Sequence, residues 1–324
     1  MSDALRLVVM GTGPFAVPMF RAALASRHPV LALVTQPARV GRGNKPAPPS
    51  PMRTVALEHN LPVLDPESIN TDEARAALQA FAPDLFLVAD YGQILANETL
   101  DVARLGGVNL HGSLLPKYRG AAPINWAIYR GDGETGVTVI QMSSKVDAGA
   151  SLAQARTPIN PEENAVELER RLCELGAPLV MEVVDRLAAG AVERLPQDPS
   201  LATGARRLRK TDGEVDWNRT AAQIKNQLRA LEPWPRTSTA WLRPAGDPMR
   251  LILTKVDVID GGHPAEPGTV VNVEKDAIVV ATGEGLIVIR ELQPAGKRAM
   301  AAGEFLRGQQ VKAGEKFGPI AAET

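Results

Sequence analysis

The chain has 324 residues and a formal net charge of −1, with 44% hydrophobic and 23% charged residues. The composition is that of an ordinary globular protein, and the length exceeds what one core usually fills, so we expect two domains. The near-zero charge gives by itself no reason to invoke nucleic acid, and a single cysteine, Cys173, excludes an internal disulfide or a Cys-based zinc site. No apolar run approaches the roughly 20 residues that cross a bilayer, and the N-terminus lacks the features of a signal peptide, so we expect a cytoplasmic protein without membrane contact.

The first half of the chain alternates apolar strands with helices. Short apolar runs predict strands over residues 5–10, 30–34, 61–64, 85–89, 108–111, 136–142 and 152–159. Helices are expected after residue 11 to about 25, from 52, over 71–81, from 123, and over 165–188. Strands that alternate with helices give a mostly parallel sheet, so we expect a doubly wound, Rossmann-like α/β domain.

The turn after the first strand contains Gly11, Gly13 and Ala16, which match the pattern G-x-G-x-x-G/A of dinucleotide-binding proteins. That site also needs an acidic residue after the second strand, and the second strand here ends in Thr35-Gln36-Pro37. We therefore interpret Gly11 and Gly13 as turn glycines and do not expect NAD.

Residues 36–51 show no hydrophobic periodicity, and five of the sixteen are Pro and two are Gly. The segment carries the basic residues Arg39, Arg42 and Lys45. A long loop without secondary structure inside a compact domain is usually functional or disordered. It is either a solvated, proline-stiffened insertion or a basic arm that orders on an anionic partner.

Asn109 and His111 alternate along the strand 108–111, so both side chains leave one face of the sheet. The loop residues Gly112, Ser113 and Pro116 follow directly. In open α/β sheets, ligands bind where strands end and loops begin. An amide donor and a titratable imidazole therefore lie together at a candidate site, although an isolated Asn/His pair is more often an ordinary loop feature.

The second half of the chain has a different organisation. Residues 190–207 are polar and contain Pro196, Pro199 and Gly204, which is typical of a linker. A helix over 220–230 is followed by regularly spaced strands at 238–242, 249–258, 268–273, 277–281 and 286–292. This spacing predicts a small, OB-like β-barrel. We expect a catalytic domain over 1–189, a linker over 190–207 and a barrel domain over 208–324. Residues 205–324 hold 18 Lys and Arg against 15 Asp and Glu, a mild positive excess.

The motif Asn109-Leu-His-Gly-Ser-Leu-Leu-Pro116, together with Asp147 in a later loop, resembles the formyltetrahydrofolate-dependent formyltransferases. Five further stretches are similar to the methionyl-tRNA formyltransferase family: 41–43, 118–123, 215–217, 232–235 and 292–300. The resemblance runs nearly end to end through both expected domains. The chain departs from the family pattern at Gly13-Pro14, at Ala38 and at Ala150.

The resemblance implies a formyl-folate-binding domain followed by a tRNA-binding barrel. The donor would be 10-formyltetrahydrofolate and the acceptor initiator methionyl-tRNA, with no metal and no NAD, and we expect a monomer. The catalytic residues would be Asn109, His111 and Asp147. The residues in contact with the folate would be Ser113, Leu114, Leu115, Pro116, Ala89, Tyr91 and Gly92. The residues in contact with tRNA would be Arg42, Arg39, Lys45, Arg209 and Lys210.

These residue types suit formyl transfer to an amine, which is acyl transfer through a tetrahedral intermediate. The Asn109 amide can donate to the developing oxyanion, and protonated His111 can add a second donor. Asp147 can hold the His111 ring and place a water that relays the proton. Two alternatives stay open: another formyltransferase, which formylates an amino sugar or hydrolyses formyl-folate, and a non-catalytic RNA-binding module.

Overall fold

The computed structural model describes residues 4–38 and 50–319. These residues form two compact units that are not continuous in sequence. The first unit is Met1–Ile124, Glu134–Pro158 and Glu167–Arg206, and the second is Asn125–Gly133, Ile159–Val166 and Arg207–Thr324. Two segments of the expected catalytic domain thus join the barrel unit. The residues 190–206, expected within a linker, join the first unit because their contacts lie there.

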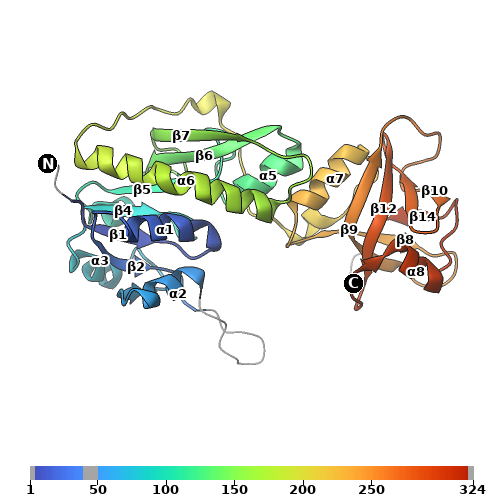
Figure 1. Ribbon diagram of the computed structural model, residues 1–324, viewed down its shortest axis with the longest axis horizontal. Coiled ribbons are helices and arrows are strands. Elements are labelled where there is room, and N and C mark those ends of the chain that lie inside the picture. Colours follow the sequence, from blue (N-terminus) through green and yellow to red (C-terminus); the bar gives the residue numbers. More distant parts are fainter. Residues whose placement is uncertain (1–3, 39–49, 320–324) are drawn as a thin grey trace. The chain divides into compact units, whose positions relative to one another are not determined.

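The first unit is built on a seven-stranded sheet (Figure 1). Its strands are β1 (Leu7–Met10), β2 (Val30–Val34), β3 (Val63–Leu64), β4 (Leu85–Val88), β5 (Gly107–His111), β6 (Glu134–Gln141) and β7 (Ser151–Pro158). Their order is β3-β2-β1-β4-β5-β6-β7, with parallel pairing as far as β5 and antiparallel pairing of β6 and β7. The expected doubly wound, mostly parallel sheet is confirmed. All residues of β1 and β4 are buried, which explains why both strands are apolar throughout.

Helices cover both faces of this sheet (Figure 1). They are η1 (Pro14–Ala16), α1 (Val17–Leu24), α2 (Pro51–Glu58), α3 (Asp72–Gln79), α4 (Asn97–Leu100) and α6 (Ala165–Ala188), while α5 (Pro123–Arg130) crosses from the first unit into the second. Thr71 caps α3 by accepting a hydrogen bond from the backbone N–H of Ala74. Leu78 of α3 packs in one core with Met10 and Phe86 of the sheet. On the other face, Gly176 of α6 lets Leu110 of β5 approach, because a Cβ there would lie 2.7 Å from the Leu110 side chain.

The second unit contains a sheet that curls into a barrel. Its elements are η4 (Lys210–Gly213), α7 (Ala221–Ala230), β8 (Thr237–Leu242), β9 (Met249–Ile259), β10 (Val270–Val273), β11 (Ile278–Ala281), β12 (Leu286–Pro294), β13 (Met300–Ala301), α8 (Ala302–Gly308) and β14 (Lys316–Gly318). The strand order is β10-β11-β12-β9-β8-β14, with β13 beside β12. A bridge between Thr269 and Lys316 joins the two edges and nearly closes the barrel. The small barrel expected from the sequence is confirmed.

Aromatic side chains fill the barrel. Trp217, Trp241, Phe305 and Phe317 belong to one buried cluster that also contains apolar residues of β9 to β12. Each indole is satisfied, since Trp217 Nε1 donates to Thr239 Oγ1 at 3.0 Å and Trp241 Nε1 donates to a Glu315 carboxylate oxygen at 2.8 Å. Within the described parts of both units, no helix is long and apolar enough to cross a membrane.

Candidate active site

Asn109 and His111 lie on β5, near the middle of the first sheet. Asn109 is in register with Val88 of the parallel strand β4, and His111 with Thr138 of the antiparallel strand β6. Because side chains alternate along a strand, both point away from the face on which Leu110 meets α6. β5 thus places an amide and an imidazole at the edge of the sheet where the parallel strands end.

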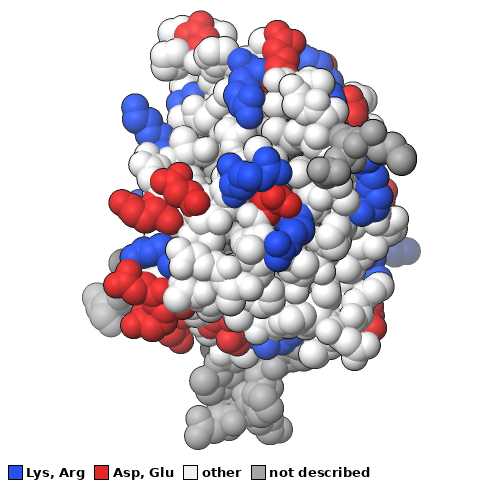
Figure 2. Space-filling model, turned by 90° about the vertical axis from the view of Figure 1, so that its left-hand side faces the viewer, with Lys and Arg blue, Asp and Glu red and all other residues white. Residues whose placement is uncertain are grey.

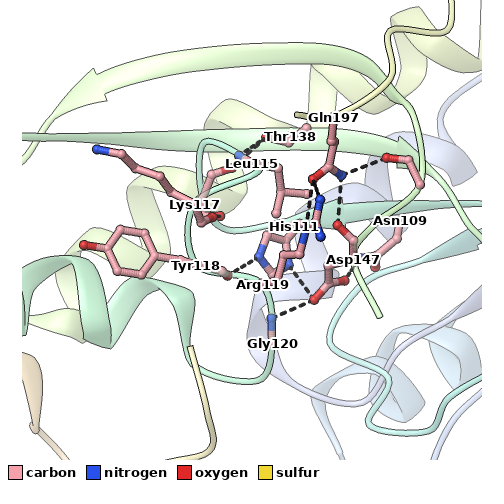
Figure 3. Close-up of polar contacts among 12 residues, drawn as sticks. Asn109, His111, Leu115, Lys117, Tyr118, Arg119, Gly120, Thr138, Asp147 and Gln197 are labelled. Atoms are coloured by element: carbon pink, nitrogen blue, oxygen red, sulfur yellow. Dashed lines mark hydrogen bonds and ion pairs between the residues drawn. The ribbon is translucent and has the colours of Figure 1, made fainter. Parts of the chain in front are cut away.

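Asp147 approaches both side chains from the loop between β6 and β7 (Figure 3). Its Oδ1 accepts a long hydrogen bond from Asn109 Nδ2 at 3.5 Å, and its Oδ2 lies 3.7 Å from His111 Nδ1. The backbone N–H of Gly120 donates to Oδ2 at 2.9 Å. The Asp147 side chain is 15% exposed and that of His111 is 6% exposed. The fold therefore brings together the three residues that were expected to be catalytic.

The His111 ring is held in one orientation by a backbone carbonyl. His111 Nε2 lies 2.9 Å from the carbonyl oxygen of Tyr118. A carbonyl oxygen can only accept, so Nε2 carries the proton and donates to it. This leaves Nδ1 as the ring nitrogen that faces the Asp147 carboxylate (Figure 3). The sequence singled out Tyr118 only as part of the family stretch 118–123, and this role of its carbonyl was not expected.

The loop from Ser113 to Pro116 is held against the antiparallel strands. Ser113 is buried, and its hydroxyl donates to the carbonyl of Lys117 at 2.7 Å. Thr138 donates to the Ser113 carbonyl at 2.7 Å and accepts from the Leu115 N–H at 3.1 Å. Gln154 Nε2 donates to the Leu115 carbonyl at 2.7 Å. The Ser113 hydroxyl therefore shapes the loop, and Thr138 and Gln154 are supporting residues that no sequence motif indicated.

The segment after β4 runs beside the end of β5. Ala89 is fully buried, and the ring of Tyr91, only 2% exposed, packs in a core with Ile69 and Leu78. Gly92 is exposed and has a φ of 84°, a conformation that favours glycine. Of the three residues expected to contact the folate here, only Gly92 lies at the surface. Ala89 is buried, and the Tyr91 side chain packs in the core.

Asp90 is a second carboxylate at this edge of the sheet. The residue as a whole is exposed, but its Oδ2 lies so close to Gly13 that a Cβ there would be 1.7 Å away. A side chain at position 13 would therefore displace the Asp90 carboxylate from this position. The surrounding protein withdraws the carboxyl group from water and raises the pKa of Asp90 to about 6. Burial and the charge of Asp90 also raise the pKa of Glu169 on α6.

Residues 195–205 hydrogen-bond to both loops of the site. Leu195 and Ser151 exchange two backbone hydrogen bonds of 2.8 and 2.9 Å. The Arg119 N–H donates to the Thr203 carbonyl at 2.8 Å, and the Arg119 carbonyl accepts from the Ala205 N–H at 2.7 Å. The expected linker is thus a strap that joins the loop after β5 to the beginning of β7. Its polar composition did not reveal these contacts.

The basic residues expected to contact tRNA are distributed over the chain. Arg39, Arg42 and Lys45 lie outside the described residues. Arg209 and Lys210 are exposed at the beginning of η4, in the second unit. Figure 2 shows a face of the first unit on which Lys and Arg side chains lie among Asp and Glu side chains. Across residues 4–38 and 50–319, there is no group of three or more His, Cys, Asp or Glu placed to hold a metal ion.

Comparison with known proteins identifies the family. The formyl transferase model matches residues 5–184, and the model of the formyl transferase C-terminal domain matches residues 207–310. The methionyl-tRNA formyltransferase of Geobacter sulfurreducens is 42% identical over 97% of each chain. That of Symbiobacterium thermophilum is 42% identical over 97% of this chain and 96% of its own.

A solved structure shows the same fold at lower identity. The sugar 3N-formyl transferase WlaRD, crystallised in the presence of dTDP and 5-N-formyl-THF, has a TM-score of 0.64 and 16% identity. The match covers 91% of this chain and 100% of that one. On the strength of the family models and of relatives at 42% identity, the chain belongs to the formyl transferase family, and within it to the methionyl-tRNA formyltransferases.

Proposed function

We propose that this protein transfers the formyl group of 10-formyltetrahydrofolate to the α-amino group of methionine on initiator methionyl-tRNA. The observation that carries the proposal is the arrangement of Asn109, His111 and Asp147 at the end of β5. It occurs in a chain that matches methionyl-tRNA formyltransferases over nearly its whole length. The presence of 5-N-formyl-THF with the sugar formyl transferase of the same fold supports a folate donor.

The Asn109 amide is the oxyanion donor in this proposal. The methionine nitrogen attacks the formyl carbon, a new C–N bond forms, and the formyl oxygen becomes anionic. An amide NH2 has two donors, and only one is directed at Asp147, across a long distance of 3.5 Å. The other can stabilise the oxyanion while the bond to N10 of the folate breaks.

His111 and Asp147 provide the route for the proton. The attacking nitrogen must lose a proton, and N10 must gain one before it leaves. His111 Nδ1 and Asp147 Oδ2 are 3.7 Å apart, so a water that lies beside the pair, and not between the two atoms, can contact both. The Tyr118 carbonyl fixes the ring, so that the relay uses Nδ1. No side chain acts as the nucleophile, because the substrate's amine does.

The binding residues are part of the same proposal. We assign the folate to the loop of Ser113, Leu114, Leu115 and Pro116 and to the segment after β4 that contains Ala89, Tyr91 and Gly92. The Tyr91 ring is buried, so its part is to support the segment that Gly92 exposes. We assign tRNA contact to the basic residues Arg39, Arg42, Lys45, Arg209 and Lys210.

An acceptor competition separates this function from its alternatives. The protein is incubated with 10-formyltetrahydrofolate and, in parallel, with charged initiator tRNA, free methionine or an amino-sugar nucleotide. We expect rapid formylation of the charged tRNA only. Formylation of the sugar, or release of formate without any acceptor, would replace the proposal by another formyltransferase activity. Binding of tRNA without any formyl transfer would indicate a non-catalytic RNA-binding protein.

We also propose that the protein acts as a monomer in the cytoplasm. Charged tRNA is used there by the ribosome, and each unit buries its own hydrophobic core. Light scattering coupled to size-exclusion chromatography should give the mass of one 34.6 kDa chain.

A further inference from the structure

Gln197, on the strap formed by residues 195–205, has a side chain directed into the site (Figure 3). Its Nε2 donates to two backbone carbonyls of the Asp147 loop, those of Asp147 at 2.8 Å and Gly149 at 2.7 Å. Its Oε1 accepts from Arg119 Nε at 3.1 Å and Arg119 Nη2 at 2.7 Å. All four hydrogen bonds lie within the first unit.

The chemistry of these partners fixes the orientation of the amide. Carbonyl oxygens only accept and a guanidinium only donates. The NH2 group of Gln197 must therefore face the two carbonyls, and its oxygen must face Arg119. An amide is the side chain of this length that satisfies both partners without adding a charge.

Asp147 requires such support because its backbone is strained. It is a non-glycine residue with a φ of 50°, in the left-handed region that non-glycine residues rarely adopt. The residues immediately before it in the loop, 143–146, are exposed. The peptide groups that set the direction of the Asp147 side chain are the ones that Gln197 holds.

Arg119 connects this support to the other side of the site. It lies between Tyr118, whose carbonyl orients His111, and Gly120, whose N–H donates to Asp147. Gln197 therefore ties the loop that orients His111 to the loop that carries Asp147 (Figure 3).

We propose that Gln197 is a positioning residue that sets the distance between the Asp147 carboxylate and His111. It acts through Asp147 and touches neither substrate. This inference rests on the proposed function, in which those two groups relay the proton. It assigns a role to the segment that the sequence presents as a linker.

The test compares two substitutions of Gln197 with a matched control. Gln197→Met keeps the length and removes all four hydrogen bonds, whereas Gln197→Glu keeps the acceptor for Arg119 and removes the two donors. The control is Gln79→Met, at an exposed position of α3 in the same unit. Since misplacement of a catalytic group by about 1 Å can cost ~10²-fold, we expect both Gln197 variants to lower kcat by ~10- to 100-fold. KM for folate and for tRNA should stay within twofold of wild type.

A double substitution distinguishes positioning from a general structural role. If Gln197 acts through Asp147, then Gln197→Met should lower kcat little further in a protein that already carries Asp147→Ala. If the double variant instead loses kcat by the product of the two single losses, the proposal is overturned. An unchanged kcat in both Gln197 variants would overturn it too. A variant with raised KM and unchanged kcat would assign Gln197 to substrate binding instead.

Hydrogen exchange provides a readout that does not depend on activity. The Gly120 N–H is bonded to Asp147, so Gln197→Met should accelerate its exchange in the substrate-free protein, while Gln79→Met should not. Unchanged exchange at Gly120 contradicts the positioning role even if the variant is inactive. If wild-type protein does not formylate charged tRNA, the proposed function fails, and the exchange result still decides whether Gln197 holds Asp147.

Discussion

Three side chains of different chemistry carry the proposed reaction, and two of them, His111 and Asp147, are oriented by a backbone group. The Tyr118 carbonyl leaves His111 only Nδ1 for the site, and the Gly120 N–H holds the Asp147 carboxylate. Asn109 is held least tightly, by one long hydrogen bond. A donor that is not fully engaged in the free protein can turn to an oxyanion when substrate binds.

We expect Asn109→Ala, His111→Ala and Asp147→Ala each to lower kcat by ~10²–10³-fold, the usual loss for an oxyanion donor or a proton relay. The proteins should stay folded, because none of the three side chains belongs to the described apolar core clusters. Single-turnover rates at saturating folate, with circular dichroism as the control for folding, measure this. Near wild-type kcat in His111→Ala would exclude the proposed relay.

The stability of the folded protein should depend on pH through the carboxyl group of Asp90. Its folded pKa of about 6 is above the ordinary value of 3.8, so the folded state binds more protons than the unfolded state between these values. The free energy of unfolding should therefore fall as the pH rises from about 4 to 6. Above pH 6 it should stay lowered by the same amount. Asp90→Asn removes this cost, so the substitution should raise Tm at pH 8 and change it little at pH 4.

Thermal unfolding at both pH values tests this, with Asp101→Asn at an exposed position as the control. An Asp90→Asn effect of equal size at pH 4 and pH 8 would mean that the carboxyl group is not the cause.

At the scale of elements, α2, α3 and α7 each begin at a residue whose side chain caps the helix. Thr220 Oγ1 accepts from the Gln223 N–H at 3.2 Å, and Gln223 Oε1 accepts from the Thr220 N–H at 3.2 Å. This reciprocal pair starts α7, whose buried Ala221 and Ile224 join the barrel core.

Thr220→Ala should destabilise the protein by about 1 kcal/mol, the typical value of an N-cap, whereas Thr220→Ser should be nearly neutral. Denaturant unfolding followed by tryptophan fluorescence reports on the second unit, since Trp217 and Trp241 lie in its core. An equal loss in both variants would indicate that the Thr220 methyl group, rather than the cap, contributes the stability.

At the scale of the whole molecule, the two units share the chain in an interleaved way. Asn125 Nδ2 donates to the Ala230 carbonyl at 2.7 Å. Arg229 donates to the carbonyls of Asn160 and Glu163 at 3.1 and 2.8 Å. The second unit thus includes two segments, Asn125–Gly133 and Ile159–Val166, that lie earlier in the sequence than its main part. A cut after Arg206 removes the partners of these segments.

A fragment of residues 1–206 should bind formyl-folate but have a lower Tm and formylate charged tRNA poorly. The lost part carries the positive excess that we propose to contact tRNA phosphates, so the tRNA KM of the full-length protein should rise more steeply with salt than that of the fragment. Folate titration, thermal unfolding and tRNA kinetics at two salt concentrations measure these effects. Equal kcat/KM for tRNA in the fragment and the full-length protein would show that the second unit is not needed for tRNA.

The sequence determined the order and type of most elements. The expected helix over 165–188 and strand over 30–34 agree with α6 and β2 to the residue, because long helical periodicity and a compact apolar run are local signals. The two-residue β13 and three-residue β14 were missed, since strands so short have no periodicity of their own. β14 forms because Phe317 enters the barrel core and its backbone pairs with β8.

The sequence also predicted which residues carry the proposed chemistry, since Asn109 and His111 lie two positions apart on one strand and Asp147 follows in a later loop of the same family pattern. Only the tertiary structure decided how they are held. Gln197 meets Asp147 and Arg119 across some 50 and 78 positions, and Tyr91 turns its ring into the core. Contacts between distant segments depend on how strands and loops pack in space, and local composition carries no record of that packing.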